Sequence, residues 1–262
     1  MSQTTAALLG AIAGVTIFIG LPVARLRGLR PGVQGFLNAL ATGVLVFILW
    51  DILAHAGEPL ETVLAAAHKG SPLPFVLLAV IFAVGLGAGL LSLVYFNGRL
   101  LRRRADTSGP ISPKTLSMMI ATGLGLHNLS EGLAIGQSAA TGAVAFAGVL
   151  VIGFALHNIT EGFGIAAPMS MARAPVSWSF IGMAGLVGGG PTFVGTLIGY
   201  VVVSPYAYVV FLALAAGALI YVINELFALG RRLCTPQAMA WGLLGGFLAA
   251  YSTDLFLTYL AL

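Results

Sequence analysis

Long apolar runs, separated by short polar or basic breaks, follow one another along the whole chain. Eight of these runs are long enough to cross a bilayer as helices, since its hydrocarbon core takes about 20 helical residues. The runs are continuous and lack the alternation of barrel strands about ten residues long, so we expect helices. The predicted spans are 5–24, 33–56, 73–98, 113–138, 140–168, 176–203, 206–229 and 236–261. The pattern predicts an all-α integral membrane protein with eight transmembrane helices, residues 1–262 forming a single transmembrane domain.

The distribution of basic residues predicts how the spans are oriented. With eight spans, alternate breaks face alternate sides of the membrane, and every Lys and Arg except Lys69 falls on one side. Basic residues gather in cytoplasmic loops, so that side is predicted to be the cytoplasm. Both termini are then expected outside the cytoplasm.

Composition excludes a soluble protein. Of the 262 residues, 59% are hydrophobic and only 8% are charged, where a soluble domain has about 25% charged residues. The arginines lie in short gaps between apolar runs, so the net positive charge does not indicate a nucleic-acid partner. The single cysteine, Cys234, excludes a disulfide framework and a thiolate metal cluster.

The fourth and fifth predicted spans carry the same polar motif about halfway along their length. Residues 127–132 read HNLSEG and residues 157–162 read HNITEG. Ionisable side chains inside a membrane are costly and usually functional, and residues four apart share one helix face. The short connection makes the two spans antiparallel neighbours, so we expect one site near the membrane midplane. Its predicted ligands are His127, Glu131, His157 and Glu161.

Two imidazoles and two carboxylates suit a borderline divalent ion such as Zn²⁺, Fe²⁺ or Mn²⁺. Two carboxylates also balance the charge of one such ion, which offsets much of the cost of burying either. Without thiolates, binding can be reversible, as transport requires. The alternative is that each His–Glu pair only forms hydrogen bonds between helices.

At these residues the sequence resembles the ZIP (Zrt-, Irt-like) family of metal-ion transporters, and most of all its GufA-type branch, whose corresponding spans carry H-N-x-P-E-G. Residues 39–55 are similar to the family's second span and residues 215–226 to its seventh. The resemblance implies transport of a divalent metal toward the cytoplasm by alternating access, with no organic cofactor. Zinc is the expected substrate, with iron, manganese or cadmium as alternatives. It also implies a homodimer in a prokaryotic cell inner membrane.

The resemblance further implies roles for single residues. The four ligands above would bind the transported metal, and Asn128 and Asn158 would form an adjoining second site. Asp51 would lie near the external entrance, and Asn224 and Glu225 near the cytoplasmic exit. On the residues alone, Asp51 could instead be an interfacial helix cap, and Glu225 could pair with Arg231 or Arg232.

The sequence departs from the family pattern at three positions. Ser130 and Thr160 stand where the motif has proline, and these side chains can bend a helix more gently by bonding a backbone carbonyl. Gly190, before Pro191, stands where a further glutamate is common in the sixth span, so a second metal would lack that carboxylate.

Two other classes of function remain open from the residues. An intramembrane zinc hydrolase would activate a metal-bound water, although the chain lacks the H-E-x-x-H order of the familiar proteases. A structural or sensing membrane protein could use the metal only to join the fourth and fifth spans. The repeated motif and the polar residues toward both ends of the path favour transport.

Overall fold

The computed structural model describes residues 1–25, 30–68, 70–103, 112–140, 142, 144–171, 176–202 and 204–261. For some residues inside helices, His157 among them, it describes the backbone alone. Over these ranges the chain is helical and contains no strand, which confirms the predicted all-α class. The elements are α1 (Gln3–Val15), α2 (Ile17–Gly20), η1 (Leu21–Arg25), α3 (Pro31–Ala67), α4 (Pro72–Arg103), α5 (Pro113–Ala140), α6 (Val144–Ala166), η2 (Ala167–Met171), α7 (Trp178–Val201), α8 (Pro205–Leu233) and α9 (Pro236–Ala261).

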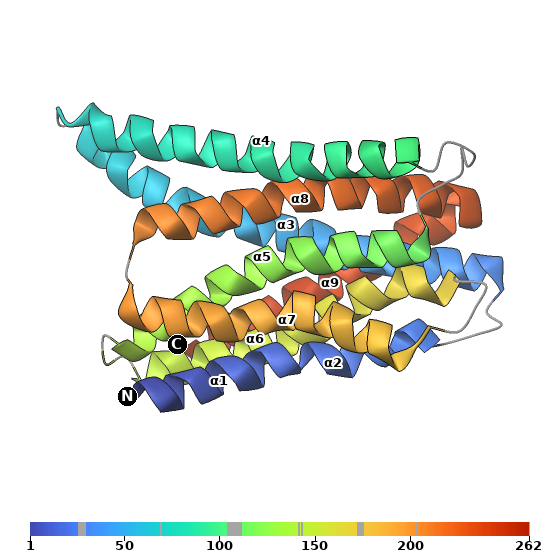
Figure 1. The fold of residues 1–262 in the computed structure, drawn as a ribbon, viewed down its shortest axis with the longest axis horizontal. Coiled ribbons are helices and arrows are strands. Elements are labelled where there is room, and N and C mark those ends of the chain that lie inside the picture. The colour runs from blue at the N-terminus through green and yellow to red at the C-terminus, as the bar shows by residue number, and fades with distance from the viewer. Residues whose placement is uncertain are drawn as a thin grey trace.

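The helices run up and down side by side in one bundle (Figure 1). If α1, α2 and η1 are taken as one rod, the described helices form eight successive rods, in agreement with the predicted number of spans. Both termini lie at one end of the bundle with the α3–α4, α5–α6 and α7–α8 connections. The ends of η1 and α8, which carry Arg25, Arg231 and Arg232, lie at the other end.

Length and composition alone mark six segments of the described chain as membrane spans. They are Gln3–Arg25, Pro31–Ala67, Pro72–Tyr95, Leu150–Met169, Trp178–Val201 and Pro205–Leu233. The other two long helices are α5 and α9. α5 carries His127, Asn128 and Glu131, and such polar side chains lower the hydropathy of a helix that is otherwise apolar.

The predicted break at residues 57–74 is wrong over most of its length, because α3 continues to Ala67. Good helix formers such as Glu58, Glu61 and Leu64 follow the predicted end of the span and extend the helix. Pro59 lies inside this extension and has no amide hydrogen, so it cannot donate to the carbonyl of His55 one turn earlier. The helix ends at Ala67, and the chain turns toward α4 near Gly70, which has φ +106°.

Glycines divide the bundle into two groups of interlocked helices. In the first, which we call the α5 group (α1, α2, α5, α6 and α7), a Cβ on Gly189 would meet the carbonyl of Gly14. In the same way a Cβ on Gly162 would meet the carbonyl of Ile17, so both α7 and α6 lie against the backbone of the first rod. Small residues allow such close approach of membrane helices.

The second group, the α3 group, consists of α3, α4, α8 and α9. A Cβ on Gly246 of α9 would meet the carbonyl of Leu40 in α3, and a Cβ on Gly217 of α8 would meet that of Leu86 in α4. Asn38 also donates from its side-chain amide to the carbonyl of Leu226, a 2.9 Å hydrogen bond that joins α3 to α8.

The two groups meet through side chains. Among the described glycines, Gly123 of α5 and Gly164 of α6 face the other group. A Cβ on Gly123 would lie 3.3 Å from Cβ of Ala218, and one on Gly164 would lie 3.7 Å from Cδ2 of Leu45. At these two positions, the nearest atoms across the interface belong to side chains, whereas within each group the nearest atom to such a Cβ is often a backbone carbonyl oxygen.

Candidate metal centre

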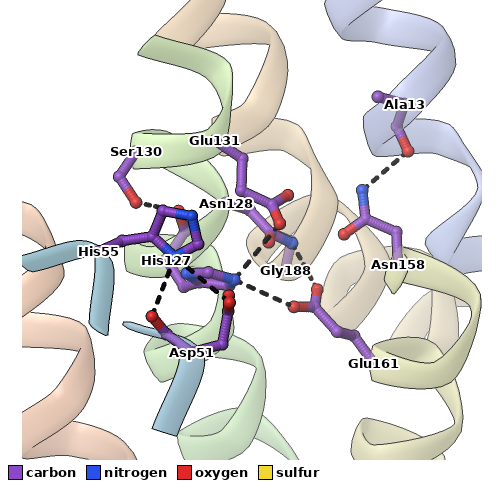
Figure 2. Close-up of polar contacts among 10 residues, drawn as sticks. All are labelled: Ala13, Asp51, His55, His127, Asn128, Ser130, Glu131, Asn158, Glu161 and Gly188. Carbon is purple, nitrogen blue, oxygen red and sulfur yellow. Dashed lines mark hydrogen bonds and ion pairs between the residues drawn. The ribbon is translucent and has the colours of Figure 1, made fainter. Parts of the chain in front are cut away.

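Three ionisable side chains meet in the interior of the bundle, where α5 lies against α6 (Figure 2). Nε2 of His127 is 3.3 Å from Oε1 of Glu131 and 3.8 Å from Oε1 of Glu161. One ligand atom from each residue lies within 4.8 Å of the other two. The three residues are at most 5% exposed. The structure thus brings together three of the four predicted ligands, His127, Glu131 and Glu161, which we call the trio.

The helix around the first motif is unbroken, although serine replaces the motif proline. Ser130 donates from Oγ to the carbonyl of His127 at 2.6 Å, one turn back, while α5 continues from Pro113 to Ala140. His127 and Glu131 therefore keep the four-residue spacing that places them on one face. Gly132 lets α7 lie directly behind them, because a Cβ there would meet the carbonyl of Thr192.

The spacing of the trio fits a transition-metal ion. Ligands at about 2.1 Å from a tetrahedral Zn²⁺ lie about 3.4 Å apart, close to the separations measured from His127. Within the two motifs, three other buried oxygens have no hydrogen-bond partner among the described residues: Oε2 of Glu131, Oδ1 of Asn128 and Oδ1 of Asn158. Outside the motifs, Oδ1 of Asn38 and Oγ1 of Thr192 also have none. Buried polar atoms without partners are rare, and a bound cation or water is a usual reason for them.

Asn128 holds one carboxylate of the trio in place. Its amide nitrogen donates to Oε2 of Glu161 at 2.8 Å and to the carbonyl of Gly188 in α7 at 3.0 Å. Because both neighbours of this nitrogen are acceptors, the hydrogen-bond network assigns the amide orientation. Asn128 thus connects α5, α6 and α7 around Glu161, with its own oxygen left toward the site.

Asn158, the matching residue of the second motif, is joined to a different helix. Its amide nitrogen donates to the carbonyl of Ala13 in α1 at 2.8 Å. The same carbonyl accepts from Oγ1 of Thr16 at 2.6 Å, at the point where α1 gives way to α2. The repeated asparagines, identical in sequence, therefore have different partners (Figure 2).

The other predicted site residues are not part of the trio. His157 lies on α6 one turn before Glu161, but its side chain is outside the described residues. Asn224 is exposed and Glu225 is half-buried on α8. Glu225 is 13 residues beyond Leu212, about 20 Å further along the helix than the level of the trio's cavity. In the described part of the chain, Glu225 forms no ion pair with Arg231 or Arg232.

A cavity of about 30 Å³ adjoins the trio on the side of α3. It is large enough for about one water or one ion. Its lining residues are Asp51, Ile52, His55, His127, Ser130, Glu131, Ala134, Phe154, Tyr208 and Leu212. Two lining residues, Tyr208 and Leu212, lie in the first turns of α8, which begins at Pro205. Because α8 begins at the end of the bundle that carries the termini, the cavity lies toward that end (Figure 1).

Asp51 and His55 form an ion pair at the outer side of this cavity, with Nδ1 of His55 3.2 Å from Oδ1 of Asp51 (Figure 2). The Asp51 side chain is 14% exposed and that of His55 47% exposed. Asp51 lies in the middle of α3, so the alternative that it caps a helix end is wrong. Sequence reasoning missed His55, although its four-residue spacing from Asp51 in an apolar run was a usable signal.

Residues 100–229, about half of the chain, match the family model described as ZIP Zinc transporter. The match includes both motifs and all of α5, α6 and α7, while Asp51 and His55 lie outside it. A search of curated proteins found no relative that matches.

Proposed function

Because the chain belongs to the ZIP zinc transporter family and is therefore a divalent-metal transporter of the membrane and not an enzyme, we propose that the trio binds the transported ion. The observation that carries this proposal is the convergence of His127, Glu131 and Glu161 in a buried site. The imidazole and the two carboxylates supply one nitrogen and up to four oxygens, with enough negative charge for one M²⁺. We propose zinc as the substrate, and His157 as a fourth ligand.

We propose that the ion arrives past Asp51 and His55. This pair is partly exposed, carries a carboxylate that attracts cations, and borders the same cavity as His127 and Glu131. If the basic end of the bundle faces the cytoplasm, the cavity is on the outer side and uptake is inward. Asn224 and Glu225, on the opposite half of α8, would then be met on the way out.

The division into two helix groups supports alternating access. The trio belongs to the α5 group, and the entrance pair belongs to the α3 group. We propose that the α5 group moves as a unit against the α3 group, because glycine contacts with backbone atoms hold the helices within each group together. Side-chain contacts between the groups, as at Gly123 and Gly164, can be exchanged more easily. We also expect a homodimer in a prokaryotic inner membrane.

Zinc uptake into proteoliposomes tests the proposal directly. Vesicles that contain the protein and a trapped zinc indicator should fill faster than empty vesicles, with a rate that saturates as external zinc rises. A protein that binds zinc without filling the vesicles would instead be a sensor or a metal-joined structural protein. Parallel assays with iron, manganese and cadmium would rank the substrates.

We expect one tightly bound ion per chain. Glu131 and Glu161 together offset the charge of one divalent ion, and the nitrogen of Asn128 is already used as a donor. At Gly190 there is no carboxylate, and a Cβ there would meet no atom within 4 Å. Anomalous diffraction from crystals soaked in cadmium would measure the number of sites. Two strong peaks about 4 Å apart, the spacing of two-metal sites, would contradict this expectation.

Substituting the two asparagines is expected to have different effects. Asn128→Ala removes the donor that orients Glu161, so zinc affinity should fall about 10- to 100-fold, as for other residues that support a metal ligand. Asn158→Ala removes a hydrogen bond to Ala13, so it should lower thermal stability and leave zinc affinity within about threefold of the unmodified protein. Calorimetric zinc titration in detergent measures both. Equal losses of affinity would show that Asn158 is also a ligand.

A further inference from the structure

A large groove opens between α8 and α9, far along the chain from the trio. Although these helices are consecutive, α9 packs against α3, and α8 packs against both α3 and α4, so the two diverge after their connection. The groove has a volume of about 530 Å³, within the range of about 300–1,000 Å³ of small-molecule sites. Its lining residues are Phe227, Arg231, Cys234, Pro236, Met239, Ala240 and Leu243.

The base of the groove is firmly packed. Cβ of Cys234 lies 2.7 Å from where a Cβ on Gly35 would be, so the α8–α9 connection rests on α3. Cε of Met239 lies 3.3 Å from the corresponding point on Gly230. The floor of the groove is therefore closed by contacts within the α3 group.

Its walls and rim have opposite chemistry. Phe227, Met239 and Leu243 give an apolar lining, and Phe227 lies on α8, which is long and apolar enough to span a membrane. Arg231 is exposed in the last turn of α8, and within the described residues it forms no ion pair. A hollow on the lipid-facing side of a span fills with hydrocarbon, and an arginine at its rim attracts an anion.

We propose that this groove binds one anionic phospholipid, with the phosphate on Arg231 and an acyl chain along Phe227 and Leu243. The guanidinium matches a phosphate with two parallel hydrogen bonds. A free phosphate lacks the chain, and a zwitterionic lipid brings its own cation to the rim. The bound lipid fills the space that separates α8 from α9, so it supports the α3 group and makes no contact with the trio.

The experiment measures thermal unfolding of the purified protein in an uncharged detergent with added dioleoyl-phosphatidylglycerol. The midpoint should rise by several degrees, while dioleoyl-phosphatidylcholine and inorganic phosphate at equal concentration should raise it by less than half as much. Arg231→Gln should remove most of the rise. Arg232→Gln is the matched control, because this neighbouring exposed arginine does not line the groove, and it should keep the rise.

A second variant tests the apolar part of the site. Ala240→Trp would fill the groove with a side chain and should also remove the rise, although the charge at its rim is unchanged. Each variant is compared with its own midpoint without lipid, so a change of basal stability does not hide the result. Equal rises with both lipids, an equal rise with phosphate, a rise retained by Arg231→Gln or Ala240→Trp, or a loss in Arg232→Gln equal to that in Arg231→Gln would overturn the proposal.

Discussion

Replacing Glu161 by glutamine is expected to reduce zinc uptake at least about tenfold while the protein still inserts and folds. Glutamine keeps the shape of the side chain and removes one of the two charges that balance the ion. The complex would then hold one uncompensated positive charge in a setting of low dielectric, which is strongly unfavourable. His127→Ala and Glu131→Gln should have losses of similar size, since each removes one of the three described ligands.

Two matched controls separate the loss of a ligand from a general loss of charge. Glu61→Gln and His68→Ala make the same kinds of change at exposed positions in and next to the last turns of α3. Both should leave uptake within about twofold of the unmodified protein. Zinc binding by the detergent-purified variants, measured by calorimetry, should fall together with uptake for the trio alone. Normal uptake by any two of the trio variants would mean that the metal crosses elsewhere.

The second large effect is expected from glycines at the contact between α5 and α7. A Cβ on Gly195 would meet the carbonyl of Leu129, and a Cβ on Gly132 would meet that of Thr192. Alanine at either position must separate the two helices, at a cost of about 1–3 kcal/mol typical of overpacking. The midpoint of thermal unfolding should then fall by roughly 2–4 °C for each kcal/mol.

Gly190 provides the control on the same helix. Alanine there meets no atom within 4 Å, and alanine favours a helix over glycine by about 1 kcal/mol, so Gly190→Ala should leave the midpoint unchanged or raise it. Because α7 also accepts the hydrogen bond from Asn128 at Gly188, Gly195→Ala should lower uptake as well. If all three alanine variants unfolded at the same temperature, the close approach of α5 and α7 would not be what stabilises the bundle.

The features of the fold that depend on a single helix, or on two consecutive helices, could be predicted from the sequence. Apolar length predicts the rods, and the four-residue spacing of His127 and Glu131 predicts their common face. The antiparallel connection of the two spans predicts that Glu161 joins them. The end of α3 could not be predicted in this way, because Gly57 and Pro59 are local break signals that the surrounding helix formers override.

Contacts between a motif residue and a third helix could not be predicted from the sequence either. The resemblance implies a place for Asn158 at a second metal site, but the motif does not indicate that its amide donates to the carbonyl of Ala13 in α1, far away in the chain. The division into two groups likewise depends on which backbone faces each glycine, and a glycine in an apolar run does not indicate its neighbour. His55 forms a single pair with Asp51 in another span, and an unrepeated pair in an apolar run is a weaker signal than a repeated motif.

The unequal surroundings of Asn128 and Asn158 have a consequence for how this gene can change over generations. At 128, a substitute must supply a nitrogen that donates to two acceptors together with an oxygen that has no other partner, which asparagine alone supplies at that length. At 158, a substitute needs to supply only one donor, to the carbonyl of Ala13. Purifying selection should therefore be stronger on the first copy of the motif than on the second. A comparison of descendants would find the two halves of the repeat drifting apart at this position first.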